Sequence, residues 1–103
     1  MITIMFHATA KVDKVEAFCA MAIKATEATR AEDEGCITYV FHQQRDNPQA
    51  FVVYEQWQDQ EALDAHIAHL QRLFGPPAPG RQLPAALLDL CEETKAIRYD
   101  VVA

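Results

Sequence analysis

The 103-residue sequence predicts an α+β protein with a four-stranded antiparallel sheet and two helices on one face of that sheet. Three observations support this fold class. The length suits one domain, spanning residues 1–103, with a single modest core. The predicted elements follow the order strand, helix, strand, strand, helix, strand, which a split βαβ arrangement satisfies. Only a short turn separates the second strand from the third, so those two strands are expected to form an antiparallel hairpin.

The first part of the chain predicts a strand followed by a long helix. Residues 2–8 (ITIMFHA) are apolar and β-prone, so they predict the first strand. Residues 12–32 predict a helix, with Asp13 as its N-cap because Glu16 follows three positions later. A weakly apolar face recurs at helical spacing and consists of Val15, Phe18, Cys19, Ala22, Ile23 and Thr26.

Two further strands follow, with a turn between them. Residues 36–43 (CITYVFHQ) are rich in β-branched and aromatic side chains and predict the second strand. Residues 45–48 (RDNP) have the composition of a turn, because Asp and Asn tolerate turn geometry and the proline restricts the residue before it. Residues 50–57 (AFVVYEQW) then predict the third strand.

A second helix and a last strand complete the predicted order. Asp59 is the expected N-cap of a helix over residues 59–74, and Gly75 with the proline after it ends that helix. An irregular connection leads to residues 85–91, where a short helix is expected. Residues 94–102 (TKAIRYDVV) predict the last strand, because apolar side chains alternate there.

The third strand is apolar on both of its sides. Phe51 and Val53 point to one face of the predicted sheet, whereas Val52 and Tyr54 point to the other. The two helices cover only one face, so the other face needs a second cover. We therefore expect a homodimer in which two sheets pack face to face.

Composition excludes several classes of function. The formal net charge is −6 and the isoelectric point is about 5.0, so the surface repels the phosphates of nucleic acids. The chain contains no serine, which excludes a serine nucleophile. Its three glycines, Gly35, Gly75 and Gly80, form no phosphate-binding loop.

The expected compartment is the cytoplasm. No apolar run approaches the roughly 20 residues needed to cross a bilayer, and the N-terminus lacks the pattern of a signal peptide. Cys19, Cys36 and Cys91 are odd in number and widely spaced, which favours free thiols in a reducing compartment. A nucleophilic Cys36 is the alternative, and no neighbouring residue supports it.

His66 is the strongest candidate for a catalytic residue in the sequence. It lies in the apolar stripe of the second helix, which consists of Leu63, His66, Ile67, Leu70, Leu73 and Phe74. His66 is either a core histidine with one hydrogen bond or a cavity histidine that moves a proton. His69 lies at the edge of the stripe. Metal sites do use the i, i+3 spacing, but two ligands do not make a site, so no metal is expected.

Aromatic side chains are expected near His66. Trp57 closes the third strand and can meet His66 across the turn, either as a core residue or as a stacking surface. Tyr39 and Phe41 share one face of the second strand and can line the same space. Together with Leu70 on the second helix, these residues would surround a cavity.

Three polar residues of the strands need partners or solvent. Glu55 shares the face of the tryptophan and needs a partner, for which Arg30, Arg72 or a histidine would serve. His7 lies in the middle of the first strand, either as a hydrogen-bonded sheet residue or as a second proton-transfer group. His42 lies close to the turn and is expected to be solvated.

Residues 51–57 (FVVYEQW), with Asp59 after them and His66 nine positions beyond the tryptophan, resemble the antibiotic biosynthesis monooxygenase (ABM) domain. That family typically has an F-x-x-Y-E-x-W strand, an acidic helix start and a histidine at this spacing. Residues 29–36 (TRAEDEGC) are similar to the family's end of the first helix and entry to the second strand. The resemblance covers residues 1–74 and implies a ferredoxin-like βαββαβ protomer within a dimeric α/β barrel.

The resemblance also implies chemistry. Some relatives are cofactor-independent monooxygenases, so the implied substrates are dioxygen and a small phenolic, quinol or polyketide-like aromatic, with no cofactor. His66 would then be the base, and His7 its alternate or its hydrogen-bond partner. The substrate-binding residues would be the flat walls Trp57, Tyr39 and Phe41 and, at the bottom, Leu70.

Other functions of the fold differ in what they require. Haem-degrading relatives use an asparagine in the first strand and an axial histidine about ten residues beyond the position of His66. His7 and Pro76 occupy those positions here, so haem degradation is not expected. A non-oxidative isomerase that acts on a small keto compound remains open, as does a dimeric small-molecule-binding module without turnover.

Overall fold

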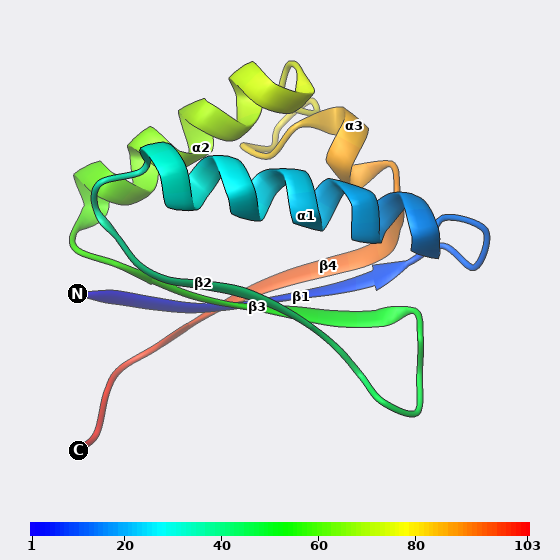
Figure 1. Ribbon diagram of the computed structural model, residues 1–103, viewed down its shortest axis with the longest axis horizontal. Helices are drawn as coiled ribbons and strands as arrows, with labels where there is room; N and C mark the ends of the chain where they lie inside the picture. The colour runs from blue at the N-terminus through cyan, green and yellow to red at the C-terminus, as the bar shows by residue number, and fades with distance from the viewer.

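The computed structural model of the protein describes residues 1–103, with one sheet and helices on one side of it (Figure 1). The strands are β1 (Ile2–Ala10), β2 (Cys36–Gln43), β3 (Ala50–Trp57) and β4 (Cys91–Tyr99). The helices are α1 (Val15–Glu32), α2 (Gln60–Phe74) and the short α3 (Ala85–Leu88). The order across the sheet is β2-β3-β1-β4, and all neighbouring strands are antiparallel. The predicted α+β, ferredoxin-like fold is therefore confirmed.

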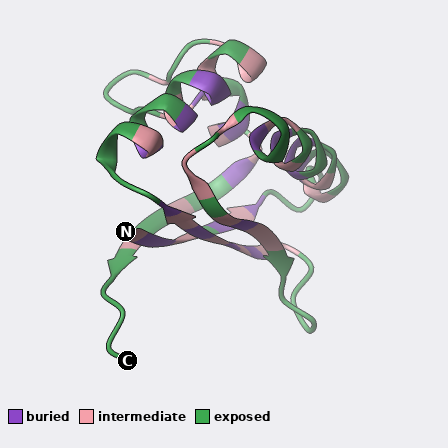
Figure 2. Ribbon diagram, turned by 60° about the vertical axis from the view of Figure 1, so that its left-hand side comes forward, coloured by how far each residue is buried: buried purple, intermediate pink, exposed green.

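Alternation of side chains gives the sheet two different faces. In β3 the residues that face the helices are buried, and the residues between them are half-buried. Figure 2 shows the buried residues gathered where the sheet and the helices face each other. The β2–β3 hairpin has the predicted bounds at both of its strands, because β-branched and aromatic residues fill both.

Helix α2 begins and ends as the sequence predicts. The Asp59 carboxylate accepts a hydrogen bond from the backbone N–H of Ala62 at 2.8 Å and so caps the first turn. Gly75 ends the helix with φ +107°, a backbone conformation that favours glycine. None of the protein's helices has the length and apolar character needed to span a lipid bilayer.

Helix α1 differs from its prediction in two respects. Asp13 is not its cap, because it lies inside a turn closed by the bond from the Lys14 N–H to the Lys11 carbonyl at 2.9 Å. Ile23 is 61% exposed, so the face that meets the sheet is rotated away from it. The buried residues of this helix are Phe18, Met21, Ala22, Ala25 and Thr29.

Strand β4 begins and ends three residues earlier than the predicted range 94–102. It pairs with β1, and its last paired residue, Tyr99, lies opposite Thr3 at the start of that strand. Val101 has no strand beside it, although the apolar alternation continues to that position. Helix α3 is likewise shorter than the predicted 85–91, since β4 already begins at Cys91.

The face of the sheet opposite the helices carries an apolar row. The register places four half-buried side chains next to one another across all four strands: Val40, Tyr54, Met5 and Ile97. We refer to these four residues as the open-face row. No helix of the chain covers this face (Figure 1).

Candidate active site

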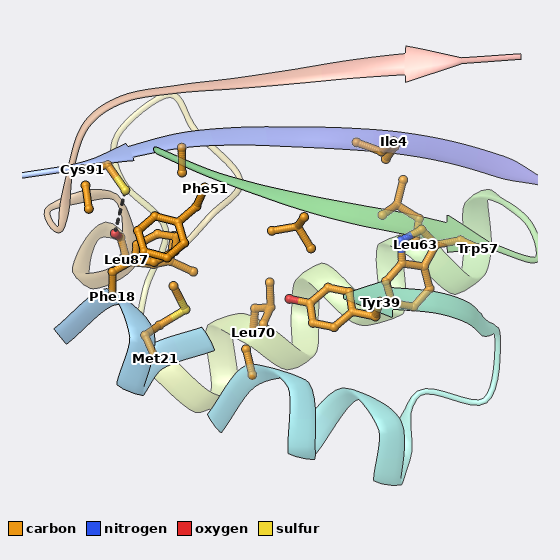
Figure 3. Packing of buried hydrophobic residues seen from close by; sticks show 14 residues of the cluster. Ile4, Phe18, Met21, Tyr39, Phe51, Trp57, Leu63, Leu70, Leu87 and Cys91 are labelled. Atoms are coloured by element: carbon orange, nitrogen blue, oxygen red, sulfur yellow. Dashed lines mark hydrogen bonds between the residues drawn. The ribbon is translucent and has the colours of Figure 1, made fainter. Parts of the chain in front are cut away.

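A mostly apolar cavity of about 260 Å³ lies between the sheet, α2 and the segment around α3. Its apolar lining comes from every layer of the fold and includes Ile4, Phe6, Phe18, Met21, Leu70 and Leu87. Most of these residues appear in the packing view of Figure 3. Tyr39, Glu55 and His66 are the polar groups deep in this space, and the exposed Gln82 and Arg98 lie at its rim.

His66 points from α2 into the protein and is only 2% exposed. It is placed there by the helical period, because Leu63 and Leu70 are buried on the same side of α2. Its ring centroid lies 4.3 Å from that of Trp57 and 4.9 Å from that of Tyr39. The expected contact between Trp57 and His66 is therefore confirmed.

Asp33, at the end of α1, joins His66 to a second buried histidine. Its Oδ2 lies 2.7 Å from Nδ1 of His66, and its Oδ1 lies 2.8 Å from Nδ1 of His69. His69 is 5% exposed, so it lies inside the protein rather than at the edge of the stripe. Its other nitrogen, Nε2, lies 3.2 Å from Oε2 of the exposed Glu32.

Sequence reasoning missed Asp33, which lies 33 positions from His66 in the chain. The available signal was the pair His66 and His69 on one helix face. Two buried imidazoles need polar partners, and an acidic residue is the strongest one. The acidic residues 32–34 (EDE) end the first helix, where the chain must turn back over the second helix.

Gly35 allows the Asp33 segment to lie this close to α2. A Cβ atom at position 35 would collide with the Cβ of Ala62 in the first turn of that helix. The Gly35 carbonyl also accepts a hydrogen bond from the backbone N–H of Gln58 at 2.9 Å. The close approach of these two segments brings the carboxylate to the histidines.

The electrostatic surroundings of His66 favour a neutral ring. Burial lowers the pKa of His66 below 6.5, and the hydrogen bond and charge of Asp33 oppose that shift. The ring's Nε2 has no hydrogen-bond partner within the protein. Thr29 Oγ1 is the one fully enclosed side-chain N or O atom without a partner, so Nε2 of His66 is not fully enclosed. His66 lines the cavity, and Nε2 is its ring nitrogen without a partner in the protein.

Glu55 is a second titratable group of the cavity. Its Oε1 accepts a hydrogen bond from Nε1 of Trp57 at 3.0 Å. Burial raises the pKa of Glu55 from 4.5 to about 7. The partner of this carboxyl is therefore an indole, not Arg30, Arg72 or a histidine. Arg30 instead donates to the backbone carbonyl of Tyr39 at 3.3 Å.

Tyr39, Phe41 and Leu70 all line the cavity, where the sequence analysis placed them. The rings of Tyr39 and Phe41 meet edge to face with centroids 5.5 Å apart. In Figure 3 the Tyr39 hydroxyl points away from Trp57 and toward the middle of the layer. Burial raises the pKa of Tyr39 well above 10, so the phenol stays protonated at neutral pH.

Two residues of the sequence-based site do not reach the cavity. Trp57 is fully buried behind His66 and supports its ring, so it is not a wall of this space. His7 is exposed on the open face of the sheet, because its neighbours Phe6 and Ala8 point toward the helices. The expectation that His7 works beside His66 is therefore wrong. His42 is exposed, as predicted.

The site offers neither a metal-binding cluster nor an activated thiol. No group of three or more His, Cys, Asp or Glu side chains is arranged to hold a metal ion. Burial raises the pKa of Cys36, with the charges of Asp33 and Glu55 acting in the same direction. This thiol is therefore held away from the nucleophilic thiolate form.

Comparisons with known proteins agree with the architecture. A crystal structure of an antibiotic biosynthesis monooxygenase superimposes with a TM-score of 0.79 at 23% identity, with each chain covered over 100% of its length. A conserved protein of Methanosarcina mazei gives a TM-score of 0.75 at 29% identity, over 95% of this chain and 89% of the other. At these identities the superpositions describe the fold.

Sequence comparison gives one partial relative and one family model. An uncharacterised protein of Synechocystis is 37% identical over 57 residues, which are 55% of this chain and 38% of that protein. This chain therefore matches less than half the length of that curated relative. The family model described as antibiotic biosynthesis monooxygenase matches residues 1–71, well over half of the chain. The chain belongs to the antibiotic biosynthesis monooxygenase family.

Proposed function

We propose that the protein is a cofactor-independent monooxygenase that oxidises a small phenolic, quinol or polyketide-like aromatic with dioxygen. The observation that carries this proposal is the unpartnered Nε2 of His66 at the wall of an apolar cavity of about 260 Å³. Small-molecule sites typically occupy roughly 300–1,000 Å³, so this cavity is slightly smaller than that range and suits only a compact ring system.

The proposed reaction begins with loss of a proton from the substrate. His66 accepts the hydroxyl proton at Nε2 and leaves an electron-rich anion. The anion donates one electron to triplet dioxygen, and the two resulting radicals combine to form a carbon–oxygen bond. Loss of water from the peroxide leaves one oxygen atom in the product. The substrate supplies both electrons and both hydrogens of that water, so no external reductant is needed.

The cavity residues have distinct roles in this proposal. Tyr39 and Phe41 hold the ring of the substrate, and Leu70 closes the apolar space beneath it. Exclusion of water strengthens the interaction between His66 and the developing anion. Glu55, with a pKa near 7, exchanges protons with the reacting centre during loss of water.

We also propose that the functional unit is a homodimer that packs sheet against sheet. The open-face row supports this, because four half-buried apolar side chains lie side by side with no cover from their own chain. Burying such a row against its own copy removes apolar area from water and satisfies two-fold symmetry. In this proposal residues 1–103 act as one domain.

The proposed location is the cytoplasm. Cys19, Cys36 and Cys91 are all free thiols. Free thiols persist in a reducing compartment, and buried or half-buried ones are common there.

Oxygen uptake tests the proposed reaction. The purified protein is mixed with a panel of quinols and polycyclic phenols in an oxygen electrode, and His66→Ala is compared with the wild type. We expect turnover to fall by roughly 10²-fold or more, since general-base catalysis typically contributes 10²–10⁴-fold. His7→Ala is the matched control and retains turnover, because its ring lies on the opposite face. Unchanged turnover of His66→Ala would remove His66 from the mechanism.

The second candidate is a non-oxidative isomerase of a small keto compound. It is favoured by one observation: Glu55 and His66 are two proton-transfer groups that line a single cavity. Product analysis under nitrogen separates the two candidates, because only the monooxygenase stops without dioxygen. A protein that binds aromatics with no turnover in either atmosphere would instead be a binding module.

A further inference from the structure

We propose that Asp33 is the positioning residue of this site: it fixes His66 as the tautomer that carries its hydrogen on Nδ1, which leaves Nε2 as the base. His69 holds the second oxygen of the same carboxylate and so fixes its orientation. The effect on turnover rests on the function proposed above. The assignment of the tautomer does not, because it follows from contacts between protein atoms.

The chemistry of the Asp33 carboxylate determines which nitrogens of the two histidines carry hydrogen. Asp33 places Oδ2 at 2.7 Å from Nδ1 of His66 and Oδ1 at 2.8 Å from Nδ1 of His69. An ionised carboxylate accepts hydrogen bonds and donates none, so each Nδ1 carries the hydrogen that it donates. A neutral His66 then has its lone pair on Nε2, the ring nitrogen that has no partner in the protein, on a residue that lines the cavity.

The Asp33 carboxylate is held rigidly by its own backbone and by the two histidines. The Asp33 backbone N–H donates to the Thr29 carbonyl at 3.0 Å, and its own carbonyl accepts from the Cys36 N–H at 3.0 Å. The side chain of Asp33 is only 9% exposed, so water competes little for its two oxygens. The backbone on both sides of Asp33 is therefore held while two imidazoles hold the side chain.

His69 also lies beside a second carboxylate, that of Glu32. Nε2 of His69 lies 3.2 Å from Oε2 of Glu32, whose side chain is 67% exposed. His69 thus stands between a buried carboxylate and a solvated one. This arrangement supplies Asp33 with a donor that does not depend on the cavity or on its occupant. His66 alone faces the cavity, which separates the base from the residues that orient it.

Nitrogen NMR of the ¹⁵N-histidine-labelled protein tests the assignment without reference to activity. His66→Gln and His69→Gln identify the two resonance sets. In the wild type we expect both rings to carry hydrogen on Nδ1 and His66 to be unprotonated at Nε2. A wild-type His66 that carries its hydrogen on Nε2 overturns the proposal.

Asp33→Asn provides the matched perturbation. The amide has nearly the shape of the carboxylate but presents an NH2 donor in place of one oxygen, so one of the two Nδ1 atoms faces a donor instead of an acceptor. We expect the histidine that faces the NH2 group to lose its hydrogen on Nδ1 and to carry one on Nε2, so that Nδ1 accepts from the amide. Asp64→Asn, an exposed aspartate of α2 bonded to Gln60, is the control and changes neither ring. An Asp33→Asn protein in which both rings keep the wild-type tautomer contradicts the proposal.

Kinetics of the same variants link the tautomer to the reaction. Where His66 is the ring that changes, kcat falls by roughly 10²-fold or more while KM stays within a few-fold, since the cavity walls are intact. A changed His66 tautomer with full kcat overturns the positioning role. If the wild-type tautomer is as assigned and no substrate is oxidised, the proposed function fails and the assignment stands. If His66→Ala abolishes turnover but Nε2 carries the hydrogen in the wild type, the tautomer assignment fails and the proposed function stands.

Discussion

The two faces of the β-sheet carry the same kinds of side chain in different surroundings. Toward the helices, His66 and His69 are buried and share one carboxylate. On the open face, His7 and His42 are exposed, and no hydrogen bond connects either ring to another residue. A histidine of this protein becomes a candidate base through its partner and its enclosure, because the four histidines divide into two classes on those grounds.

Aromatic residues of β3 provide the largest test of this comparison. Trp57→Ala removes a fully buried indole on the helix side, and we expect it to lower the free energy of unfolding by about 3–5 kcal/mol. Tyr54→Ala, on the open face, should cost about 1 kcal/mol in the separate protomer. Urea unfolding monitored by circular dichroism measures both values.

Tyr54→Ala should have its main effect on assembly. Because Tyr54 lies in the open-face row, its loss is expected to weaken the proposed dimer, which sedimentation equilibrium measures. A wild-type chain that stays monomeric at all concentrations, with Tyr54→Ala as costly as Trp57→Ala, would show that the two faces are not energetically different.

The next largest expected effect is a change of the free energy of unfolding with pH, caused by the buried carboxyl of Glu55. The pKa of Glu55 is raised from 4.5 to about 7, so between these values the unfolded chain loses this proton while the folded protein retains it. Stability is therefore lost as pH rises through that window, by roughly 3 kcal/mol at about 1.4 kcal/mol per pKa unit. Glu55→Gln removes this loss, so its stability relative to the wild type should increase from pH 4 to pH 8.

The sign of the His66 contribution is opposite. Its folded pKa is lowered, so the unfolded chain takes up a proton first and stability is lost as pH falls below 6.5. The difference between wild type and Glu55→Gln isolates Glu55 from this effect. Glu93→Gln, which replaces an exposed carboxylate of β4 outside the cavity, is the control. An equal slope for both variants would contradict the raised pKa of Glu55.

The loop that carries Asp33 is expected to show a modest effect on stability. Gly35→Ala forces the loop away from Ala62, at a cost of about 1–3 kcal/mol, as for other overpacked sites. The displaced loop should also lengthen the contacts from Asp33 to both histidines. Gly80→Ala is a useful comparison, since open space surrounds position 80 although its φ of +72° adds backbone strain. Histidine NMR spectra that change in Gly80→Ala but not in Gly35→Ala would contradict this account.

Local signals predicted most of the fold. The β2–β3 hairpin and the Asp59 cap were correct because turn residues, β-branched runs and a capping aspartate act over a few positions. The Asp13 cap was wrong because a preceding turn competes for the same segment. Strand β4 was misplaced because its end is set by its partner β1, which its own pattern does not encode.

The candidate site was predicted only in part, for a related reason. Helical spacing was sufficient to turn His66 inward, and strand alternation was sufficient to place Tyr39 and Phe41 beside it. Alternation also places His7 on the face of Met5, away from the helices, although it was grouped with His66. Asp33 could not be found from local pattern, because its role depends on where the end of α1 lies over α2.

The hydrogen bond from Trp57 to Glu55 has a practical consequence. Trp57 is the only tryptophan of the chain, and its indole contacts both the Glu55 carboxyl and the His66 ring. Its fluorescence therefore originates at the candidate site alone and senses the ionisation of two adjacent groups. The protein thus contains a built-in optical reporter, which allows titration and aromatic ligand binding to be followed without an added label.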